Sequence, residues 1–332
     1  MTAPGGGVPE GTPVGAGAMA DLALGTAQLG LDYGVTNRHG RPDGAEAMAL
    51  LATAARHGIA TLDTARAYGT SEEAIGRART RWGAHADGRS FPFAIVTKLD
   101  PGVAAPGQGA REAGRDAGAS VRRSLDALGV ERLDALLLHR PAQRAGADGA
   151  AWRTLLELRE QGLIDRLGVS LSTPDQLLEA LGDPDVAHVQ FPSNCLDHRF
   201  ETRAVRGALA CRPDVTVHVR SAFLQGLIVA GTRERLVAMF GGRGHVVADF
   251  LERLPALAGR RTRLAAAIAY ARSLAGVDAV VVGTGRAEEL EEIVTGPDGE
   301  GAMPLDADRM AAIREERPML DDDVLDPARW GR

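Results

Sequence analysis

A single-domain α/β fold, the closed (β/α)8 or TIM barrel, is predicted by three observations. Short apolar runs alternate with helical patterns, eight such runs can be recognised, and the chain has 332 residues. Parallel strands joined by crossover helices give this alternation, and barrels of about 250 residues or more often form one domain. The strand candidates are residues 22–25, 59–62, 93–97, 133–138, 165–169, 186–190, 215–219 and 279–282.

The segments between these runs have the spacing of amphipathic helices. Before the fourth strand, for example, Ala117, Val121 and Leu125 recur every four residues. Glycines follow several of these segments, where a left-handed residue commonly ends a helix: Gly58, Gly129, Gly162 and Gly276. The first strand is followed by GTAQLGLDYG, which lacks the GxGxxG order of an open dinucleotide-binding sheet. A closed barrel is therefore favoured over an open sheet.

The two ends of the chain are expected to lie outside the barrel. Residues 1–20 are rich in Gly, Pro and Ala and lack the basic start and apolar core of a secretion signal, which predicts a flexible tail. We expect the barrel over residues 21–320 and a C-terminal tail over residues 321–332. Two long connections, residues 100–114 and 226–260, follow strand ends and are candidate lids. The second is expected to contain short helices.

Composition and charge narrow the class of partner. A net charge of -6 and an isoelectric point near 5.8 argue against a nucleic-acid partner. No stretch approaches the roughly 20 apolar residues that a membrane helix needs. Cys195 and Cys211 give neither a disulfide framework nor a metal-ligand spacing, so no metal is expected and the cytoplasm fits. The expected partner is a small molecule, and the chain is expected to be a monomer or a small homo-oligomer.

Four polar residues lie at the ends of consecutive strand candidates. Asp63 follows the second strand, Lys98 ends the third and His139 ends the fourth. Tyr68 lies five residues after Asp63, in the loop. The C-terminal strand ends of a barrel open on one face, where barrel enzymes have their active sites. These four side chains are therefore predicted to converge on one cavity.

Lys98 is the only lysine, since the other 37 of the 38 lysine and arginine residues are arginine. An amine can lie close to a phenol, whereas guanidinium is a broad planar fork. A phenol ordinarily titrates near 10, so Tyr68 needs a nearby positive charge to donate a proton at neutral pH. We expect Asp63 to hold Lys98 and His139 to orient a substrate oxygen towards Tyr68. Each residue alone could be structural, but four at consecutive strand ends favour catalysis.

These residues resemble the catalytic Asp, Tyr, Lys and His of the aldo-keto reductases, which correspond to Asp63, Tyr68, Lys98 and His139. The similarity covers about residues 21–295. It is carried by GTAQLGLDYG, LDTARAYGTSEEAIG, VTKLD, LLLHRP, GVS, VQFPSN, SAFLQGL and VVGTGRAEELEEIV. The resemblance implies a reductase that converts an aldehyde or ketone to an alcohol, with hydride from a nicotinamide cofactor and a proton from Tyr68.

The resemblance also implies a cofactor, NADP with NAD as the alternative, that lies extended across the barrel mouth. Its carboxamide is expected at Ser170 and Gln190, its pyrophosphate near Ser221, and its adenosine end along residues 283–286. The expected cofactor-binding residues are Gly25, Thr26, Ser170, Gln190, Arg220, Ser221, Leu224, Gly226, Gly283, Thr284, Gly285, Arg286 and Glu289.

Several positions depart from the family's usual residues. Leu171 stands where Asn is usual, and Arg220 stands where an aromatic ring commonly stacks on nicotinamide. Glu289 and Ile293 stand where Arg or Gln and then Asn often meet the adenosine. Two other functions therefore stay open. One is a non-redox acid-base enzyme, such as an epimerase, lyase or cyclase, and the other is a redox-sensing barrel that binds a partner protein.

The sequence leaves the substrate unidentified. Its rim is expected from residues 29–33, 100–115 and 194–200, from Arg140 and from the C-terminal tail. Arg140, together with His198 or Arg199, could meet an anionic substrate. The family's usual β-hairpin under the barrel floor is not found ahead of the first strand.

Overall fold

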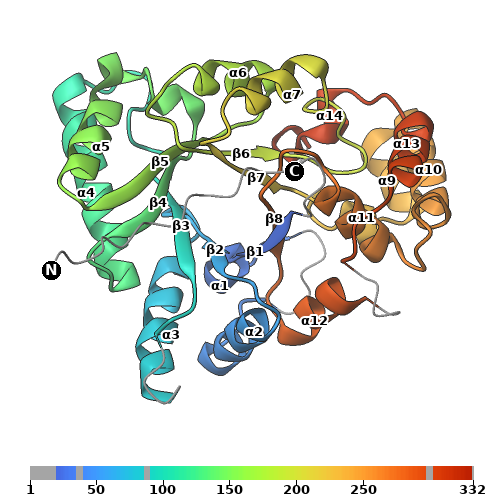
Figure 1. Ribbon diagram of the computed structural model, residues 1–332, viewed down its shortest axis with the longest axis horizontal. Helices are drawn as coiled ribbons and strands as arrows, with labels where there is room; N and C mark the ends of the chain where they lie inside the picture. The colour runs from blue at the N-terminus through green and yellow to red at the C-terminus, as the bar shows by residue number, and fades with distance from the viewer. Residues whose placement is uncertain (1–19, 35–39, 86–89, 297–301, 331–332) are drawn as a thin grey trace, which may run out of the picture.

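The computed structural model describes residues 20–34, 40–85, 90–296 and 302–330, so nearly all of the expected N-terminal tail lies outside the described residues. Eight parallel strands close into a barrel in chain order, and the last strand pairs with the first (Figure 1). The predicted (β/α)8 fold is confirmed. The strands are β1 (Asp21–Gly25), β2 (Thr61–Asp63), β3 (Ala94–Lys98), β4 (Leu133–Leu138), β5 (Ile164–Ser170), β6 (His188–Pro192), β7 (Thr216–Arg220) and β8 (Ala279–Gly283).

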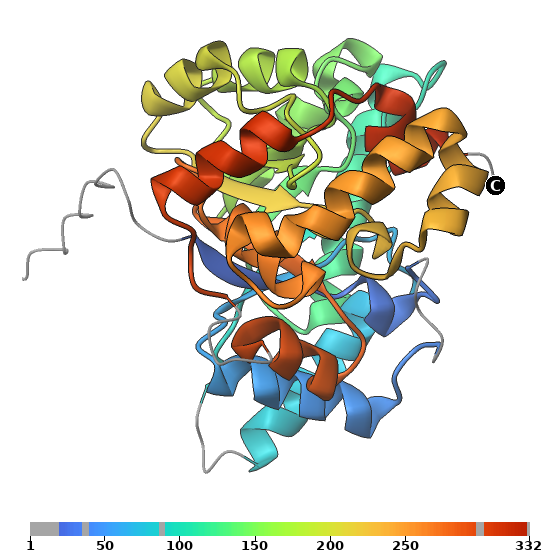
Figure 2. The same ribbon diagram turned by 90° about the vertical axis from the view of Figure 1, so that its right-hand side faces the viewer.

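Helices surround the barrel in both views (Figures 1 and 2). They are α1 (Ala27–Gly30), α2 (Gly44–Arg56), α3 (Ser71–His85), α4 (Ala110–Leu128), α5 (Ala150–Glu160), α6 (Pro174–Leu181), α7 (Arg203–Ala210), α8 (Leu227–Ala230), α9 (Arg233–Phe240), α10 (Gly242–Ala258), α11 (Arg263–Arg272), α12 (Ala287–Thr295), α13 (Ala307–Glu316) and α14 (Asp322–Leu325). Three 3-10 turns are η1 (Pro141–Gln143), η2 (Ala147–Gly149) and η3 (Pro327–Arg329). The connection after Gly226 is helical, as predicted. In the ranges that the structure describes, no helix is long and apolar enough to cross a membrane.

Local sequence signals account for several helix ends. Asp43 begins α2 with a capping box: its side chain accepts hydrogen bonds from two backbone N–H groups of the first turn, and the Glu46 carboxylate accepts one from the Asp43 N–H. Gly129 ends α4 in the left-handed conformation, with φ of 65°, as its position between helix and strand predicts. These signals fix where the connections to the strands start.

The strands alternate between two apolar environments. Leu24, Leu62 and Ile95 belong to the large core between barrel and helices. Inside the barrel, Val96, Ala135 and Leu137 form a separate small cluster. Polar and charged side chains also line the interior at the C-terminal strand ends, among them Asp63, Lys98 and Gln190.

The last described residues fold back onto the barrel. Val324 and Leu325 of α14 are buried, and Asp322 pairs with Arg199 at 2.8 Å. The Trp330 ring packs against Phe240 at the end of α9, with 5.7 Å between ring centroids. The division of the chain into a barrel and two tails remains a prediction.

Candidate active site

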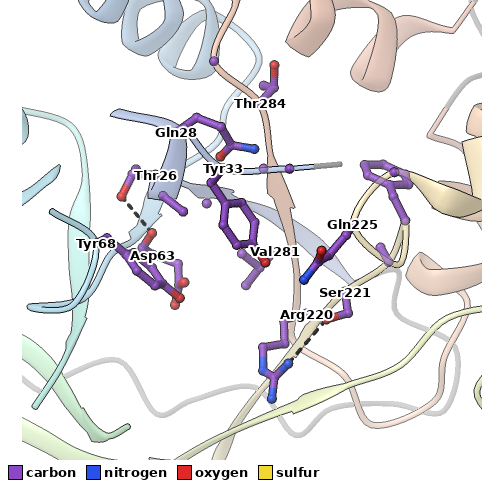
Figure 3. A pocket seen from close by; sticks show the side chains of 18 of the residues that line it. Thr26, Gln28, Tyr33, Asp63, Tyr68, Arg220, Ser221, Gln225, Val281 and Thr284 are labelled. Atoms are coloured by element: carbon purple, nitrogen blue, oxygen red, sulfur yellow. Dashed lines mark hydrogen bonds between the residues drawn. The ribbon is translucent and has the colours of Figure 1, made fainter. Parts of the chain in front are cut away.

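A cavity of about 750 Å³ opens at the C-terminal ends of the strands (Figure 3). Asp63, Tyr68, Lys98 and His139 all line it, so the structure brings the four predicted catalytic side chains together. It also brings together most of the expected cofactor-binding residues: Gly25, Thr26, Ser170, Gln190, Arg220, Ser221, Gly226, Gly283, Thr284, Gly285, Arg286 and Glu289. Leu224 is the exception, because its side chain is fully buried in the core and does not line the cavity.

Lys98 and Asp63 form a buried ion pair at the bottom of the cavity. The Lys98 Nζ lies 2.7 and 2.8 Å from the two carboxylate oxygens of Asp63 and 3.0 Å from the Thr64 carbonyl oxygen. Burial by itself would lower the pKa of the Lys98 amine, but the Asp63 carboxylate outweighs it and raises that pKa above the usual range. Lys98 is therefore an ammonium ion at neutral pH.

Tyr68 lies beside this ammonium. The Lys98 Nζ is 5.2 Å from the centroid of the Tyr68 ring, which is within cation–π range. The Tyr68 and His139 rings meet edge to face, with 6.0 Å between their centroids. The phenol thus lies between the one lysine and a histidine, as the sequence predicts.

Two glycines make room for the Tyr68 turn. A Cβ built on Gly30 would lie 1.8 Å from the Tyr68 carbonyl oxygen. A Cβ built on Gly69, whose φ is +56°, would lie 2.3 Å from the Gly30 carbonyl oxygen. The loops after β1 and β2 therefore pack backbone against backbone, which a side chain at either position would prevent.

His139 is a neutral imidazole at physiological pH. Burial, followed by the positive charges of Lys98 and Arg220, lowers its pKa to about 4. Its Nδ1 atom is buried and has no hydrogen-bond partner among the described residues. A neutral imidazole in this place can hydrogen-bond a substrate oxygen without carrying charge.

The loop after β7 has an uncommon backbone. Ser221, Leu224 and Gln225 all have positive φ, at 62°, 47° and 53°. Such left-handed residues other than glycine cost free energy and cluster at binding sites. Asn194 holds the loop through a 3.1 Å hydrogen bond from its Nδ2 to the Ser221 carbonyl oxygen. The loop is thus shaped along the wall of the cavity (Figure 3).

The far end of the cavity lies at β8 and α12, with Thr284 on the opposite side of the view from Arg220 (Figure 3). The Thr284 hydroxyl donates to the Glu289 carboxylate. Arg286 lies 3.7 Å from a carboxylate oxygen of Glu46, on α2. This end therefore carries both signs of charge.

Several groups at the cavity fit a nicotinamide dinucleotide. Gln190 is fully buried, donates through Nε2 to Asp63 at 2.7 Å, and leaves its Oε1 without a partner among the described residues. That oxygen can accept an N–H from a carboxamide. Gly25 and Gly283 keep the backbone of neighbouring strands β1 and β8 open to the cavity, where a Cβ would meet other atoms at 3.1 and 3.2 Å.

The expected rim is correct in part. Tyr33, Arg140 and Ala328 line the cavity, but no residue of the 100–115 or 194–200 segments does. Several lining residues were not predicted: Gln28, Glu46, Phe223, Gln225 and Glu292. Gln28 lies three residues after the end of β1, in α1, and could have been found from its position, whereas nothing in the local sequence places Glu46 at the cavity.

Comparison with known proteins agrees with this fold. The fold and the cavity define the class of this protein: a closed (β/α)8 barrel in which Asp63, Tyr68, Lys98 and His139 line one cavity. A sequence model of the aldo/keto reductase family matches residues 21–316, and the chain belongs to that family. The resemblance seen in the sequence is thereby confirmed.

Individual relatives match shorter stretches. An aldo-keto reductase of Mycobacterium avium (strain 104) is 32% identical over 128 residues, which is 39% of this chain and 40% of that protein. The 2,5-diketo-D-gluconic acid reductase B of Corynebacterium sp. (strain SHS752001) is 30% identical over 172 residues, 49% of this chain and 57% of that protein. The chain thus matches about half the length of these curated relatives.

A solved aldo-keto reductase of Bacillus halodurans, in its holo form, has the same fold. Its TM-score is 0.66, with 20% identity over 94% of this chain and 95% of that one. This likeness extends along nearly the whole chain and bears on the fold.

Proposed function

We propose that this chain reduces an aldehyde or ketone to an alcohol with a reduced nicotinamide cofactor, and that Tyr68 donates the proton. The observation that carries the proposal is the position of the Lys98 ammonium, 5.2 Å from the Tyr68 ring and held there by Asp63. Family membership supports a reductase, and so does the name of the Corynebacterium relative.

The chain's own residues do the proton chemistry. Tyr68 gives its phenolic proton to the carbonyl oxygen, and the Lys98 ammonium stabilises the phenolate that remains. The neutral imidazole of His139 orients the same oxygen by a hydrogen bond. The bound cofactor supplies the hydride that the carbonyl carbon receives.

The residues proposed to hold the cofactor divide into three groups. Ser170 and the free Oε1 of Gln190 would meet the carboxamide, the Ser221 loop would meet the pyrophosphate, and residues 283–286 would meet the adenosine end. NADP, with NAD as the alternative, stays a prediction. Arg286 favours a 2′-phosphate, whereas Glu289 opposes one, because both line the same end of the cavity.

Parallel titrations with NADPH and NADH test the proposal. We expect at least one of them to bind, seen as a change in its nicotinamide fluorescence. Tyr68→Phe should then lower kcat with an aldehyde panel by roughly 10²- to 10⁴-fold, the usual contribution of a general acid, while cofactor affinity is nearly unchanged.

Tyr270→Phe is the matched control, because the Tyr270 ring is fully buried and bonds Glu201 away from the cavity. It should keep its turnover at a temperature where the variant is folded. Full activity of the Tyr68→Phe variant would contradict the proposal. Failure to bind either cofactor would favour the non-redox acid-base function.

A further inference from the structure

We propose that the substrates of this site carry an anionic group, a carboxylate or a phosphate, and that Arg140 and Arg220, which line the cavity with His139, bind it. This inference rests on the proposed reductase function and adds the class of carbonyl compound. It follows from two guanidinium groups that line the catalytic end of the cavity without a carboxylate partner.

Arg220 is a half-buried cation whose partners are neutral. It ends β7 and lines the cavity. Its Nη2 donates to the Leu171 carbonyl oxygen at 3.0 Å, and its Nη1 lies 3.4 Å from the Ser221 hydroxyl. Among the residues that the structure describes, it makes no ion pair. A guanidinium has five N–H donors, so several remain for a ligand.

Arg140 lies directly after His139 at the end of β4. Its backbone N–H donates to the Gln143 Oε1 at 3.0 Å, and the Gln143 amide in turn donates to the carbonyl oxygens of Asp100 and Val103. The turn that carries Arg140 is thus fixed by buried hydrogen bonds. Within the described chain its guanidinium, like that of Arg220, has no carboxylate within ion-pair distance. It is available to a ligand in the cavity.

The charges of the cavity are separated between its two ends. Asp63, the carboxylate at the catalytic end, is already paired with Lys98. The other carboxylates that line the described cavity, Glu46, Glu289 and Glu292, lie at the far end with Arg286. The catalytic end therefore keeps a net positive charge from two arginines. Arg140 is exposed, whereas Arg220 is half-buried and costly to desolvate unless an anion compensates its charge.

The positive charge at the catalytic end lowers the pKa of His139. After burial, the charges of Lys98 and Arg220 are the next largest causes of its lowered pKa, and Arg140 acts in the same direction. A field that disfavours a proton on His139 attracts an anion to the same place. A substrate whose carbonyl lies at Tyr68 and His139 can thus reach both arginines with an anionic group.

Two aldehydes that differ at one position, in charge and by one methyl group, test the inference. The probes are 4-carboxybenzaldehyde and its neutral methyl ester, methyl 4-formylbenzoate. We expect kcat/KM to be higher for the acid than for the ester. Arg220→Gln and Arg140→Gln should each lower this acid-to-ester ratio about tenfold or more, the effect of losing one charge-assisted hydrogen bond. Both aldehydes use the same cofactor, so an effect of Arg220 on cofactor binding cancels in the ratio.

Arg132→Gln is the matched control, since Arg132 precedes β4 at the opposite end of the same strand. The acid-to-ester ratio of kcat/KM in Arg132→Gln should equal that of the unchanged chain. Equal use of acid and ester, or an unchanged ratio in both Arg220→Gln and Arg140→Gln, would overturn the inference.

The reductase function and the anion site can fail separately. Turnover of neither aldehyde would count against the reductase function, and calorimetric titration with the two compounds would then decide the inference by itself. Tighter binding of the acid that both substitutions weaken would support the anion site. Equal binding of acid and ester would reject it.

Discussion

At the residue scale, the Lys98–Asp63 ion pair determines whether Lys98 can donate a proton. An ammonium ion has three N–H donors, and all three are used, two on Asp63 and one on the Thr64 carbonyl oxygen. Lys98 therefore has no proton left to give to a substrate, and it acts through its charge. In the proposed function, proton donation therefore falls to Tyr68, whose ring lies beside this ammonium.

Breaking this pair should destabilise the fold as well as abolish turnover. Lys98→Met leaves the Asp63 charge buried without its partner, so we expect the free energy of unfolding to fall by about 3–5 kcal/mol. Lys98→Met/Asp63→Asn should recover part of that loss but no activity, because the buried charge is removed while the ammonium is still missing. Urea unfolding at pH 7 measures the first effect and kcat the second.

The contribution of the Lys98–Asp63 pair to the free energy of unfolding depends on pH with a definite sign. The pKa of Lys98 is raised in the folded chain, so its stabilisation is fully present below the unfolded pKa of about 10.4 and is lost as pH rises through the folded value. The stability difference between Lys98→Met and the unchanged chain should therefore stay constant from pH 6 to pH 9. Equal stability of the two proteins at pH 7 would mean that the pair is not a buried ion pair.

The residues that could be predicted from sequence are those whose positions follow from strand ends. Asp63, Lys98 and His139 converge because parallel strands of a barrel end on one face. Glu46 and Gln225 could not be predicted in this way, since a helix and a strained loop bring them to the cavity through tertiary packing. Leu224 shows the reverse: its neighbours line the cavity, but its side chain turns into the core.

At the element scale, the position of Tyr68 depends on how two loops pack. Gly30 ends α1 in the connection after β1, Gly69 lies in the loop after β2, and each glycine lies against the backbone of the other connection. Thr26 links the same loops, because its hydroxyl donates to the Asp63 carbonyl oxygen and accepts from Ser71. Tyr68, in the loop between β2 and α3, is therefore positioned by contacts between elements.

Gly30→Ala should disturb this packing. The new methyl group would lie 1.8 Å from the Tyr68 carbonyl oxygen and 2.4 Å from the Ser71 nitrogen, so the Tyr68 turn must move. We expect kcat/KM to fall at least tenfold, since a displacement of about 1 Å at reacting groups can cost about a hundredfold. The measurement is steady-state turnover at a temperature where the variant is folded.

Gly83→Ala in α3 is the control for that substitution. No heavy atom lies within 4 Å of the position of its Cβ, and alanine favours a helix over glycine by about 1 kcal/mol. It should keep full turnover with equal or higher stability. If Gly30→Ala behaves in the same way, the proposed role of the loop packing is wrong.

Eight strands were predicted and eight are found, but their limits differ for a physical reason. Residues 59, 186 and 215 were placed in strands, whereas the strands begin at Thr61, His188 and Thr216. The backbone N–H groups of residues 59, 186 and 215 instead donate to carbonyl oxygens in or just after the last turn of the preceding helix. Apolar character continues through such turns, so the pattern of apolar residues does not show where the turn stops and the ladder begins.

At the scale of the whole molecule, the barrel interior contains buried histidines as well as apolar side chains. Branched apolar residues mostly fill such barrels, and Val96, Ala135 and Leu137 form one apolar cluster here. Farther from the mouth than Gln190, His188 packs against His218, with 4.2 Å between ring centroids. Burial lowers the pKa of both imidazoles, that of His218 to about 4. The barrel thus folds around histidines that must remain neutral.

This interior predicts acid sensitivity. Between pH 6.5 and pH 4 the unfolded chain binds a proton at His218 that the folded chain does not, so the free energy of unfolding falls as pH falls. At about 1.4 kcal/mol for each pKa unit, His218 accounts for roughly 3 kcal/mol across this range. His218→Gln should therefore show a flatter loss of stability between pH 6.5 and pH 4, measured by urea unfolding at each pH. His245→Gln, at an exposed position of α10, should leave the pH profile unchanged. Identical profiles for the two variants would show that the buried histidines do not oppose protonation of the folded barrel.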